Sequence, residues 1–559
     1  MTASGPLRVG VYNRFWATAG GGEKFAGGIA QALASRHEVT LIGHGHVDLV
    51  ELADRLQLDL AGIRWRAVEV SPTAVEAASA DFDLFINVSY GSVLVNRAAH
   101  GLYVVHFPTI GAPAPRGWRR FALRATGRLA RLTGTDLEPA RWVGGVYAPE
   151  PLGPLTHRWT DGEGQLQLAG LIGASRTEDG LGAGRRGRVI TLVLGPPAQS
   201  VSRRVVEVVD PAGWRVAAGT LRARTRRWSP PISFVSGRLA PARGPVRVRV
   251  HSATNAPGGR ARDHRLLGVS VVAVLVGPWY RRLLQLVHQP LAAAAADLSF
   301  LDSYQRVVAN SRFTATWVQR LWGIDAGVLN PPVGAQPAGD KQRRILHVGR
   351  FFAPEAGHSK RQLELVEAFA RMVGRGGAPG WTLHLVGGCD QEGMAYLDTV
   401  RAAIARAGGG AAGGGLAVQL HVNASAAELR ELFAHASIYW HATGLGEDPE
   451  IHPERMEHFG ISTVEAMSAG AVPVVIGQAG QLEVLDDGVE GYHFADLDEL
   501  VARTEALIAD PARLAALSGA ARTRAGTYGE AAFRRQLLAL VDGITATAEK
   551  DAVTGLGSG

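Results

Sequence analysis

The chain has 559 residues, 46% of them hydrophobic, which is enough for two to four domains with buried cores. Its single cysteine, Cys389, excludes an internal disulfide and any metal site built from cysteines. The net charge of +7 is unevenly distributed: residues 141–278 hold twenty arginines and eight acids, a net +12, so the remainder sums to −5. Attraction to an anionic partner is therefore expected of one region only.

The sequence predicts a cytoplasmic protein. Residues 1–6 lead into a strand-like segment without an apolar signal core. The longest apolar run, residues 266–276, is shorter than the ~20 residues that a membrane-spanning helix needs. We expect no nucleic-acid partner.

The first part of the chain alternates predicted strands and helices. A strand over residues 7–12 precedes the glycine-rich turn Gly20-Gly21-Gly22-Glu23-Lys24, which opens a helical run. Further strands are predicted at 37–42, 63–70, 83–87 and 102–108. This order predicts a doubly wound, mostly parallel α/β sheet with ligand-binding turns at the carboxyl ends of its strands, where His106 lies. The glycines let backbone N–H groups approach a phosphate or a sugar closely.

Residues 116–132 predict an amphipathic helix with a basic face. The segment has no acid and six arginines, at positions 116, 119, 120, 124, 128 and 131. The predicted apolar face consists of Trp118, Phe121, Ala122, Ala125, Leu129 and Leu132. Either this face covers a core and the arginines are solvated, or the helix lies on anionic lipid or binds a phosphorylated acceptor.

Residues 141–278 predict an inserted all-β domain. Short alternating runs are separated by turns rich in proline and glycine, which is typical of a β-sandwich. The turn Asn255-Ala256-Pro257 and the run 263–269 resemble the closing strands of a galactose-binding-like jelly roll.

A linker near residues 334–342 leads into a second α/β unit, with strands at 345–349, 383–388, 418–422 and 438–441. Two Rossmann-like domains joined by a linker imply a ligand cleft between them. The predicted division is 1–140 and 279–335 for the N-terminal Rossmann-like domain, 141–278 for the insert, 336–528 for the C-terminal Rossmann-like domain, 529–545 for a helix packing back on the first domain, and 546–559 for a disordered tail.

The second unit contains two glutamates eight positions apart, Glu457 and Glu465. Ser462 precedes Glu465 by three residues, a capping-box spacing that predicts a helix beginning at Ser462, with Gly460 and Ile461 in the turn before it. Such a helix start directs free N–H groups and a positive dipole end at one spot, beside the carboxylate of Glu457. Taken singly, Glu465 is better explained as a cap of its helix and Glu457 as a solvated acid.

Together these motifs resemble the retaining family 4 glycosyltransferases with the GT-B fold. The similarity is carried by Gly20-Gly21-Gly22-Glu23-Lys24, by residues 105–109, 308–311 and 348–350 with Lys360, and by the Glu457/Glu465 pair. It covers about residues 7–108 and 300–545 and leaves the insert outside. Within the family, the chain is most similar to the mannosyltransferase that extends dolichol-linked oligosaccharide and to its bacterial relatives.

The resemblance implies roles for single residues. Arg350 and Lys360 would hold the donor diphosphate, with Gly21 and Gly22 of the glycine turn also on the donor, and His106 would face the reacting centre. Glu465 would bind the ribose hydroxyls, and Glu457 with the backbone of Phe459, Gly460 and Ile461 would hold the transferred sugar. Arg350 and Lys360 are ten positions apart, wider than usual in the family, so Arg361 is an alternative cation.

The resemblance implies retaining transfer of a hexose, mannose included, from a GDP- or UDP-linked donor to a glycan or polyprenyl-linked acceptor on the cytoplasmic side. It implies no metal or other cofactor. An anionic membrane surface is a further expected partner, with the protein peripheral on the inner membrane face. A nucleotide-sugar epimerase, a phosphorylase on the same fold and a non-catalytic sugar-binding protein are the alternatives.

Overall fold

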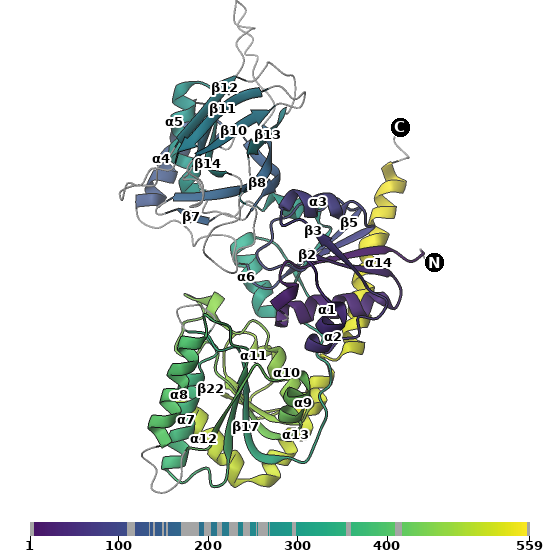
Figure 1. Ribbon diagram of the computed structural model, residues 1–559, viewed down its shortest axis with the longest axis vertical. Helices are drawn as coiled ribbons and strands as arrows, with labels where there is room; N and C mark the ends of the chain where they lie inside the picture. The colour runs from purple at the N-terminus through teal and green to yellow at the C-terminus, as the bar shows by residue number, and fades with distance from the viewer. Residues whose placement is uncertain are drawn as a thin grey trace, which may run out of the picture.

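The computed structural model describes residues 5–18, 20–108, 118–133, 135–137, 140–147, 150–152, 155–168, 189–194, 203–209, 215–222, 233–238, 246–252, 254, 267, 269–292, 298–353, 359–408 and 416–555. Three sheets mark three units. Along the longest axis, a β domain lies at one end, a Rossmann-like domain in the middle and a second Rossmann-like domain at the other end (Figure 1).

The N-terminal Rossmann-like domain is built on a seven-stranded sheet in which all neighbours are parallel. In spatial order the strands are β16 (Gly327–Val328), β15 (Arg306–Ala309), β5 (His100–Val105), β4 (Leu84–Asn87), β1 (Arg8–Tyr12), β2 (Glu38–His44) and β3 (Arg64–Val68). Its helices include α1 (Gly21–Ala34), α2 (Leu49–Leu56), α3 (Pro72–Ser79) and α6 (Arg312–Trp322). The strand order reverses between β1 and β4, the position at which open α/β sheets bind ligands.

The C-terminal Rossmann-like domain has a six-stranded parallel sheet. Its strands in spatial order are β19 (Val418–Val422), β18 (Thr382–Gly387), β17 (Gln342–Val348), β20 (Ala436–His441), β21 (Val472–Ile476) and β22 (Tyr492–Phe494). Its helices include α7 (Gln362–Gly374), α8 (Met394–Gly408), α9 (Ala426–His435), α10 (Ile461–Ser468), α11 (Gln481–Val484), α12 (Leu497–Ala509) and α13 (Pro511–Gly526). The order reverses between β17 and β20. The predicted GT-B arrangement of two Rossmann-like domains is confirmed.

The predicted all-β insert is also confirmed. Its strands are β6 (Ala140–Val146), β7 (Glu150–Leu152), β8 (Leu155–Leu168), β9 (Val189–Leu194), β10 (Arg203–Val209), β11 (Arg215–Arg222), β12 (Ser233–Arg238), β13 (Val246–Ser252) and β14 (Ser270–Val276).

The long strand β8 joins the two halves of the predicted sandwich. Trp159 pairs with β14, and from Glu163 onward β8 pairs with β13. Gly162 lies between these stretches with a φ of 101°, a left-handed conformation that favours glycine. The result is one nearly closed antiparallel sheet rather than two separate ones. The predicted jelly-roll closing segments fall mostly in residues 255–266 and 268, outside the described residues.

Two helices flank the insert, α4 (Trp118–Thr133) and α5 (Trp279–Ala292). They contact each other, with Thr126 Oγ1 2.9 Å from His288 Nδ1. Gln285 of α5 accepts a hydrogen bond from the backbone N–H of Val276 in β14. Both helices therefore pack with the β domain, although the predicted boundaries at 140/141 and 278/279 place them in the Rossmann-like domain.

The predicted apolar face of α4 is not buried as a whole. Leu129 and Leu132 are 48% and 83% exposed, whereas Thr126 and Ala130 are buried. The reason is that α4 packs on another helix through short side chains instead of covering a Rossmann core. None of the described helices is both long and apolar enough to cross a bilayer.

The last helix, α14 (Glu530–Gly555), returns to the N-terminal domain. Phe533, Leu537 and Val541 are buried in the core that β1 and α1 help to form. The helix continues to Gly555, so the prediction of disorder from residue 546 is wrong for residues 546–555. Alanine, glutamate and lysine dominate residues 546–552, and these favour helix until a glycine ends it.

Candidate active site

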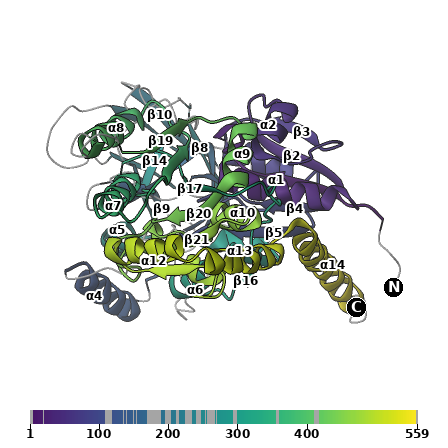
Figure 2. The ribbon, with the colours of Figure 1, turned by 90° about the horizontal axis from the view of Figure 1, so that it is seen from below.

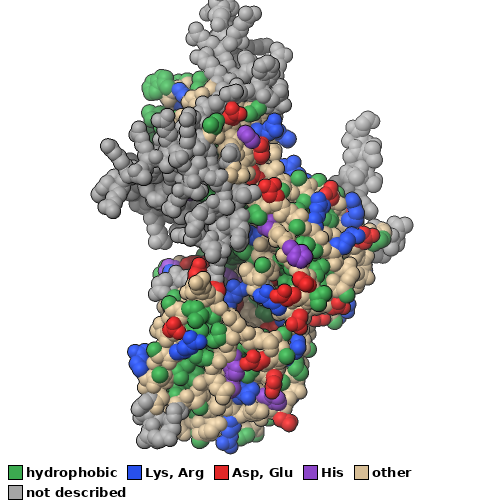
Figure 3. All heavy atoms as spheres, in the orientation of Figure 1, with side chains coloured by type: hydrophobic (Ala, Val, Ile, Leu, Met, Phe, Trp, Pro, Cys, Tyr) green, Lys and Arg blue, Asp and Glu red, His purple; other side chains and the backbone are tan. Residues whose placement is uncertain are grey.

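Segments that follow strands of both parallel sheets meet between the Rossmann-like domains: Phe107, just after β5, stacks on His458, and Gly21, after β1, lies against Ile461. From the N-terminal domain come the residues after β5 and the start of α1. From the C-terminal domain come the residues after β17 and β20 and the loop before α10. Figure 3 shows the surface hollowed between the two domains, with basic side chains beside the hollow.

The glycine turn at the start of α1 is held by Glu23. The buried carboxylate of Glu23 accepts hydrogen bonds from the N–H of Gly20 at 2.7 Å and from the hydroxyl of Thr18 at 2.7 Å. This glutamate is therefore a helix-capping residue, and its neighbours Gly21 and Gly22 present backbone to the cleft.

The glycines of this turn lie close to residues predicted for the site. A Cβ at Gly20 would collide with the guanidinium of Arg350, and one at Gly22 would lie 3.5 Å from the His106 ring. Gly21 faces Ile461 of the opposite domain, whose Cδ1 would be 3.5 Å from an added Cβ. The absence of side chains at this turn therefore lets the two domains approach each other closely.

His106 directly follows β5. Its Nε2 donates to the backbone carbonyl of Val88 at 2.7 Å, because a carbonyl can only accept. Burial lowers the pKa of His106, so the ring is neutral near pH 7 and its Nδ1 remains an acceptor. The Nδ1 of such a neutral ring can accept a hydrogen bond from a ligand hydroxyl.

Glu457 is the centre of the C-terminal side of the site. Its Oε2 accepts hydrogen bonds from Lys360 Nζ at 2.7 Å and from His441 Nε2 at 2.9 Å. The Glu457 and Lys360 side chains are mostly buried, at 16% and 18% exposure. Two donors therefore fix the orientation of this carboxylate in a partly desolvated place.

His441 was not predicted from the sequence as a site residue. It is fully buried at the carboxyl end of β20, and burial lowers its pKa, so it is a neutral donor to Glu457. Behind it lies His347, whose pKa burial lowers to about 3. The sequence signal was available: a histidine ends the otherwise apolar run Ile438-Tyr439-Trp440 at the strand end that faces ligands.

The structure distinguishes between Lys360 and Arg361, the two alternative cations after β17. Lys360 reaches Glu457, whereas Arg361 pairs with Glu364 at 3.1 Å and with Glu447 at 2.7 Å. Of the two, Lys360 is the one at the site. Arg350 is exposed and lies at the glycine turn, and among the described residues no ion pair holds its guanidinium.

The start of α10 differs from the prediction by one residue. The cap is Gly460, with a φ of 104°, and the helix begins at Ile461 rather than Ser462. Ser462 makes no cap; its hydroxyl accepts a hydrogen bond from the Tyr439 hydroxyl. A Cβ at position 460 would lie 2.6 Å from Gln481, so glycine is needed there for both backbone and space. The predicted capping box is wrong because the left-handed turn already starts the helix.

Glu465 consequently lies in the second turn of α10 and caps nothing. Its carboxylate forms an ion pair with Lys24 of the glycine turn, across the two domains. Both side chains are largely buried, at 9% and 14% exposure. The sequence marked each residue separately, but only the tertiary structure pairs them.

Phe459 contributes backbone only, because its ring is buried in the core of the C-terminal domain against Tyr528. The preceding residue, His458, projects to the other domain. Its ring stacks on Phe107, with centroids 4.2 Å apart, and lies 6.1 Å from Phe313. This contact places the Glu457 loop against the segment that carries His106.

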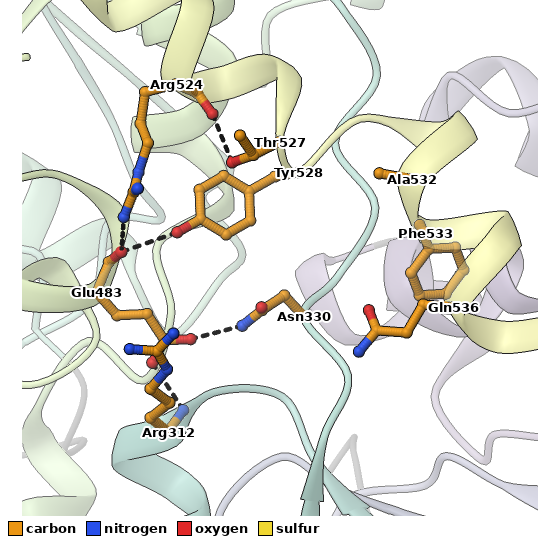
Figure 4. Close-up of a pocket in the computed structure, with 9 residues that line it drawn as sticks. All are labelled: Arg312, Asn330, Glu483, Arg524, Thr527, Tyr528, Ala532, Phe533 and Gln536. Atoms are coloured by element: carbon orange, nitrogen blue, oxygen red, sulfur yellow. Dashed lines mark hydrogen bonds between the residues drawn. The ribbon is translucent and has the colours of Figure 1, made fainter. Parts of the chain in front are cut away.

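A cavity of about 270 Å³ lies elsewhere, at the joint between the domains (Figure 4). Its polar groups bond to one another: Glu483 accepts from Asn330 Nδ2 and from the N–H of Arg312, both at 2.7 Å. Arg524 and Tyr528 donate to the Glu483 carbonyl. None of the predicted site residues lines this cavity.

Comparison with protein families gives one match. Residues 342–510 match the family model described as "Glycosyl transferases group 1". The matched segment begins with β17 and ends after α12, and so contains Arg350, Lys360, Glu457 and Glu465. No curated protein matches the sequence.

Similar solved structures share little sequence with this chain. HepE from Anabaena, in complex with UDP and glucose, is 12% identical with a TM-score of 0.48, over 96% of this chain and 99% of that one. A glycosyltransferase from Rickettsia africae is 10% identical with a TM-score of 0.49, over 97% and 99%. A sucrose-phosphate synthase from Thermosynechococcus elongatus is 20% identical with a TM-score of 0.35, over 45% and 63%. The fold assignment rests on the strand order described above.

Within the described residues, no three His, Cys, Asp or Glu side chains are grouped so as to hold a metal ion. The predicted residues are brought together from both domains: Gly21, Gly22 and His106 from one side, Arg350, Lys360, Glu457, Gly460, Ile461 and Glu465 from the other. Only the backbone of Phe459 lies at the site, because its side chain is buried in the core of the C-terminal domain.

Proposed function

We propose that the chain is a retaining hexosyltransferase that uses a nucleoside-diphosphate sugar as donor. The observation that carries the proposal is the Glu457 carboxylate held by Lys360 and His441, opposite a glycine turn and a neutral histidine. The family match over residues 342–510 supports it.

Positive charge for the donor diphosphate comes from three sources. Arg350 is exposed at the cleft, Lys360 reaches Glu457 from the loop before α7, and the first N–H groups of α10 have no acceptor within the helix. As the bond between the sugar and the diphosphate breaks, negative charge grows on the leaving phosphate. Fixed cations and N–H groups stabilise that charge more than they stabilise the ground state.

The carboxylate of Glu457 supplies the opposite charge for the sugar. Positive charge develops at the anomeric carbon, and an oriented carboxylate beside it lowers the barrier. Glu465 binds the ribose hydroxyls in this proposal, with Lys24 beside it, and the Nδ1 of His106 accepts from a sugar hydroxyl.

The finer substrate proposal is a UDP- or GDP-linked hexose, mannose included, transferred to a glycan or polyprenyl-linked acceptor on the cytoplasmic face of a membrane. Support comes from the similarity of the sequence motifs to the mannosyltransferase branch. Support also comes from the basic charge of the insert and α4, which suits a phosphorylated lipid acceptor. The division at 140/141, 278/279, 335/336 and 528/529 remains our proposal for the domains.

Transfer of a labelled sugar tests the function. UDP-glucose, UDP-galactose and GDP-mannose are screened by thermal shift, where a donor at 100 times its Kd adds about 2.7 kcal/mol to stability. The stabilising donor is then incubated, in labelled form, with glycan and polyprenyl-phosphate acceptors.

Label in the acceptor with retained anomeric configuration is the expected result. Isomerised donor without transfer would identify an epimerase, and release of a sugar phosphate that requires inorganic phosphate would identify a phosphorylase. Binding of a donor without any turnover would identify a non-catalytic sugar-binding protein. Each of these three results would overturn the proposal.

A further inference from the structure

Helix α5 exposes a row of large apolar side chains. The exposed fractions are 71% for Trp279, 53% for Leu283, 44% for Val287 and 40% for Tyr280. At 3.6 residues per turn these four positions lie within an arc of about 100°, so they form one face. The opposite face is held on the β domain, where Gln285 is buried and bonded to β14. The exposed apolar row therefore lies on a helix whose opposite face is bonded to the β domain.

Helix α4 adds to this surface. Leu129 and Leu132 are largely exposed although Thr126 contacts α5, and Arg128 and Arg131 are exposed beside them. In the view of Figure 2, α4 lies at the margin of the molecule. In Figure 3, green apolar side chains gather next to a blue basic one at the place that α5 occupies in Figure 1.

The charge of the two helices is of one sign. Together α4 and α5 contain seven arginines and no aspartate or glutamate. The guanidinium of Arg281 lies over the Tyr280 ring, 5.9 Å from its centroid, so apolar and cationic groups are interleaved. An aromatic and aliphatic face bordered by arginines is the pattern of a helix that lies in a membrane interface.

A second copy of the chain would fit this surface poorly. A two-fold contact through the same face would set the same arginines against each other without any acid from either helix. An anionic leaflet offers hydrocarbon to the apolar row and phosphate groups to the arginines at once.

We propose that α4 and α5 form an interfacial anchor that seats the protein on an anionic lipid leaflet. In it, Trp279, Tyr280, Leu283 and Val287 enter the boundary between headgroups and acyl chains, while Arg128 and Arg131 of α4 bind lipid phosphates. This inference is independent of the proposed sugar transfer, because it concerns binding without donor or acceptor.

Co-sedimentation with vesicles tests the anchor. The intact protein is mixed with vesicles of phosphatidylcholine containing 30% phosphatidylglycerol, or of phosphatidylcholine alone, at about 0.05 M and at about 0.5 M salt. The apolar variant is Trp279→Ala with Leu283→Ala, and its matched control is Val50→Ala with Val489→Ala, which are also exposed. The charge variant is Arg128→Gln with Arg131→Gln, matched by Arg534→Gln with Arg535→Gln.

We expect binding to the phosphatidylglycerol vesicles at low salt, with a partition coefficient at least about tenfold lower in the apolar variant and several-fold lower in the charge variant. Both controls should bind like the intact protein, and high salt should weaken binding. Absence of binding at low salt, equal binding to uncharged vesicles, or equal losses in the controls would overturn the anchor. So would a dimer in gel filtration that Trp279→Ala dissociates, since that assigns the face to a second copy.

Discussion

Two contacts of the N-terminal Rossmann-like domain with its neighbours differ in chemistry. Toward the C-terminal domain it offers a charged side chain, Lys24, which pairs with Glu465. Toward the β domain it offers a backbone N–H and a hydroxyl. Asp161 of β8 accepts hydrogen bonds from the N–H of Thr73 at 2.8 Å and from the hydroxyl of Ser71 at 3.1 Å. The first contact joins two side chains, and the second anchors a side chain to the start of α3.

The difference between these two contacts indicates which of them a ligand can displace. A lysine–carboxylate pair can exchange one partner for a ligand phosphate or hydroxyl with little loss, because the ligand supplies equivalent groups. A carboxylate bonded to a backbone N–H of the neighbouring domain, as Asp161 is to Thr73 and Glu483 is to Arg312, has no such substitute and would lose that partner on separation. We therefore interpret the Lys24–Glu465 pair as the domain contact that a ligand can replace, and the bonds of Asp161 and Glu483 to backbone N–H groups as the contacts that hold the domains.

The largest expected effect is at the cleft itself. Glu457→Gln keeps the shape of the side chain but removes the charge that faces the developing cation, so kcat should fall at least about 100-fold, equivalent to roughly 2.7 kcal/mol. The melting temperature should change little. Glu454→Gln, three residues earlier and more exposed, is the matched control and should retain activity. Glu457→Gln activity within threefold of the intact protein would remove this residue from the mechanism.

The junction with the β domain should respond to pH through Glu76 of α3. It is almost fully buried, and burial raises its pKa from 4.5 to about 7. The native state thus keeps a proton that the unfolded chain releases, so this contribution to stability is complete below pH 4.5 and is lost as the pH rises to about 7. The loss amounts to roughly 3 kcal/mol.

Glu76→Gln should abolish that loss, since the amide keeps an acceptor for the Val95 N–H without ionising. Thermal unfolding at pH 5 and pH 7.5 measures the difference, which should shrink in the variant and stay unchanged in the exposed control Glu69→Gln. An equal pH dependence in both variants would show that Glu76 does not govern this junction.

A moderate effect is expected from His441, which we infer to position Glu457. His441→Leu removes the donor and should lower kcat about tenfold, and the acidic limb of the kcat profile should move to higher pH, because the hydrogen bond favours the charged carboxylate. His441→Gln, which restores a donor, should recover most of the rate. A loss of rate without any displacement of the pH profile would indicate a packing role instead.

The smallest effect tests whether Glu465 serves the ligand or only the domain contact. Glu465→Gln should raise the KM for the donor about tenfold with kcat nearly unchanged, as expected for a group that binds ground and transition states alike. Lys24→Gln breaks the same ion pair and is the control. If both variants raise KM equally, the pair acts by joining the domains, and the ribose assignment fails.

Much of the architecture could be predicted from the sequence because it is encoded locally. Alternating strands and helices, the strand at 438–441 and the glycine turn Gly20–Gly22 each follow from the residue pattern within one segment. The roles proposed for Glu457 and Glu465 come from the resemblance of the motifs. The start of α10 was misplaced by one residue, because a left-handed Gly460 competes with a serine cap and local sequence does not rank the two.

Only the tertiary structure determines which side chains pair with each other. The pairing of Lys24 with Glu465 joins residues 441 positions apart. Lys360 rather than Arg361 reaches Glu457, because Glu364 and Glu447 already hold the arginine. The exposure of Leu132 and Trp279 likewise follows from which helix packs on which surface. Periodicity shows that a helix has an apolar face, but whether that face meets a core, a partner or solvent depends on the rest of the fold.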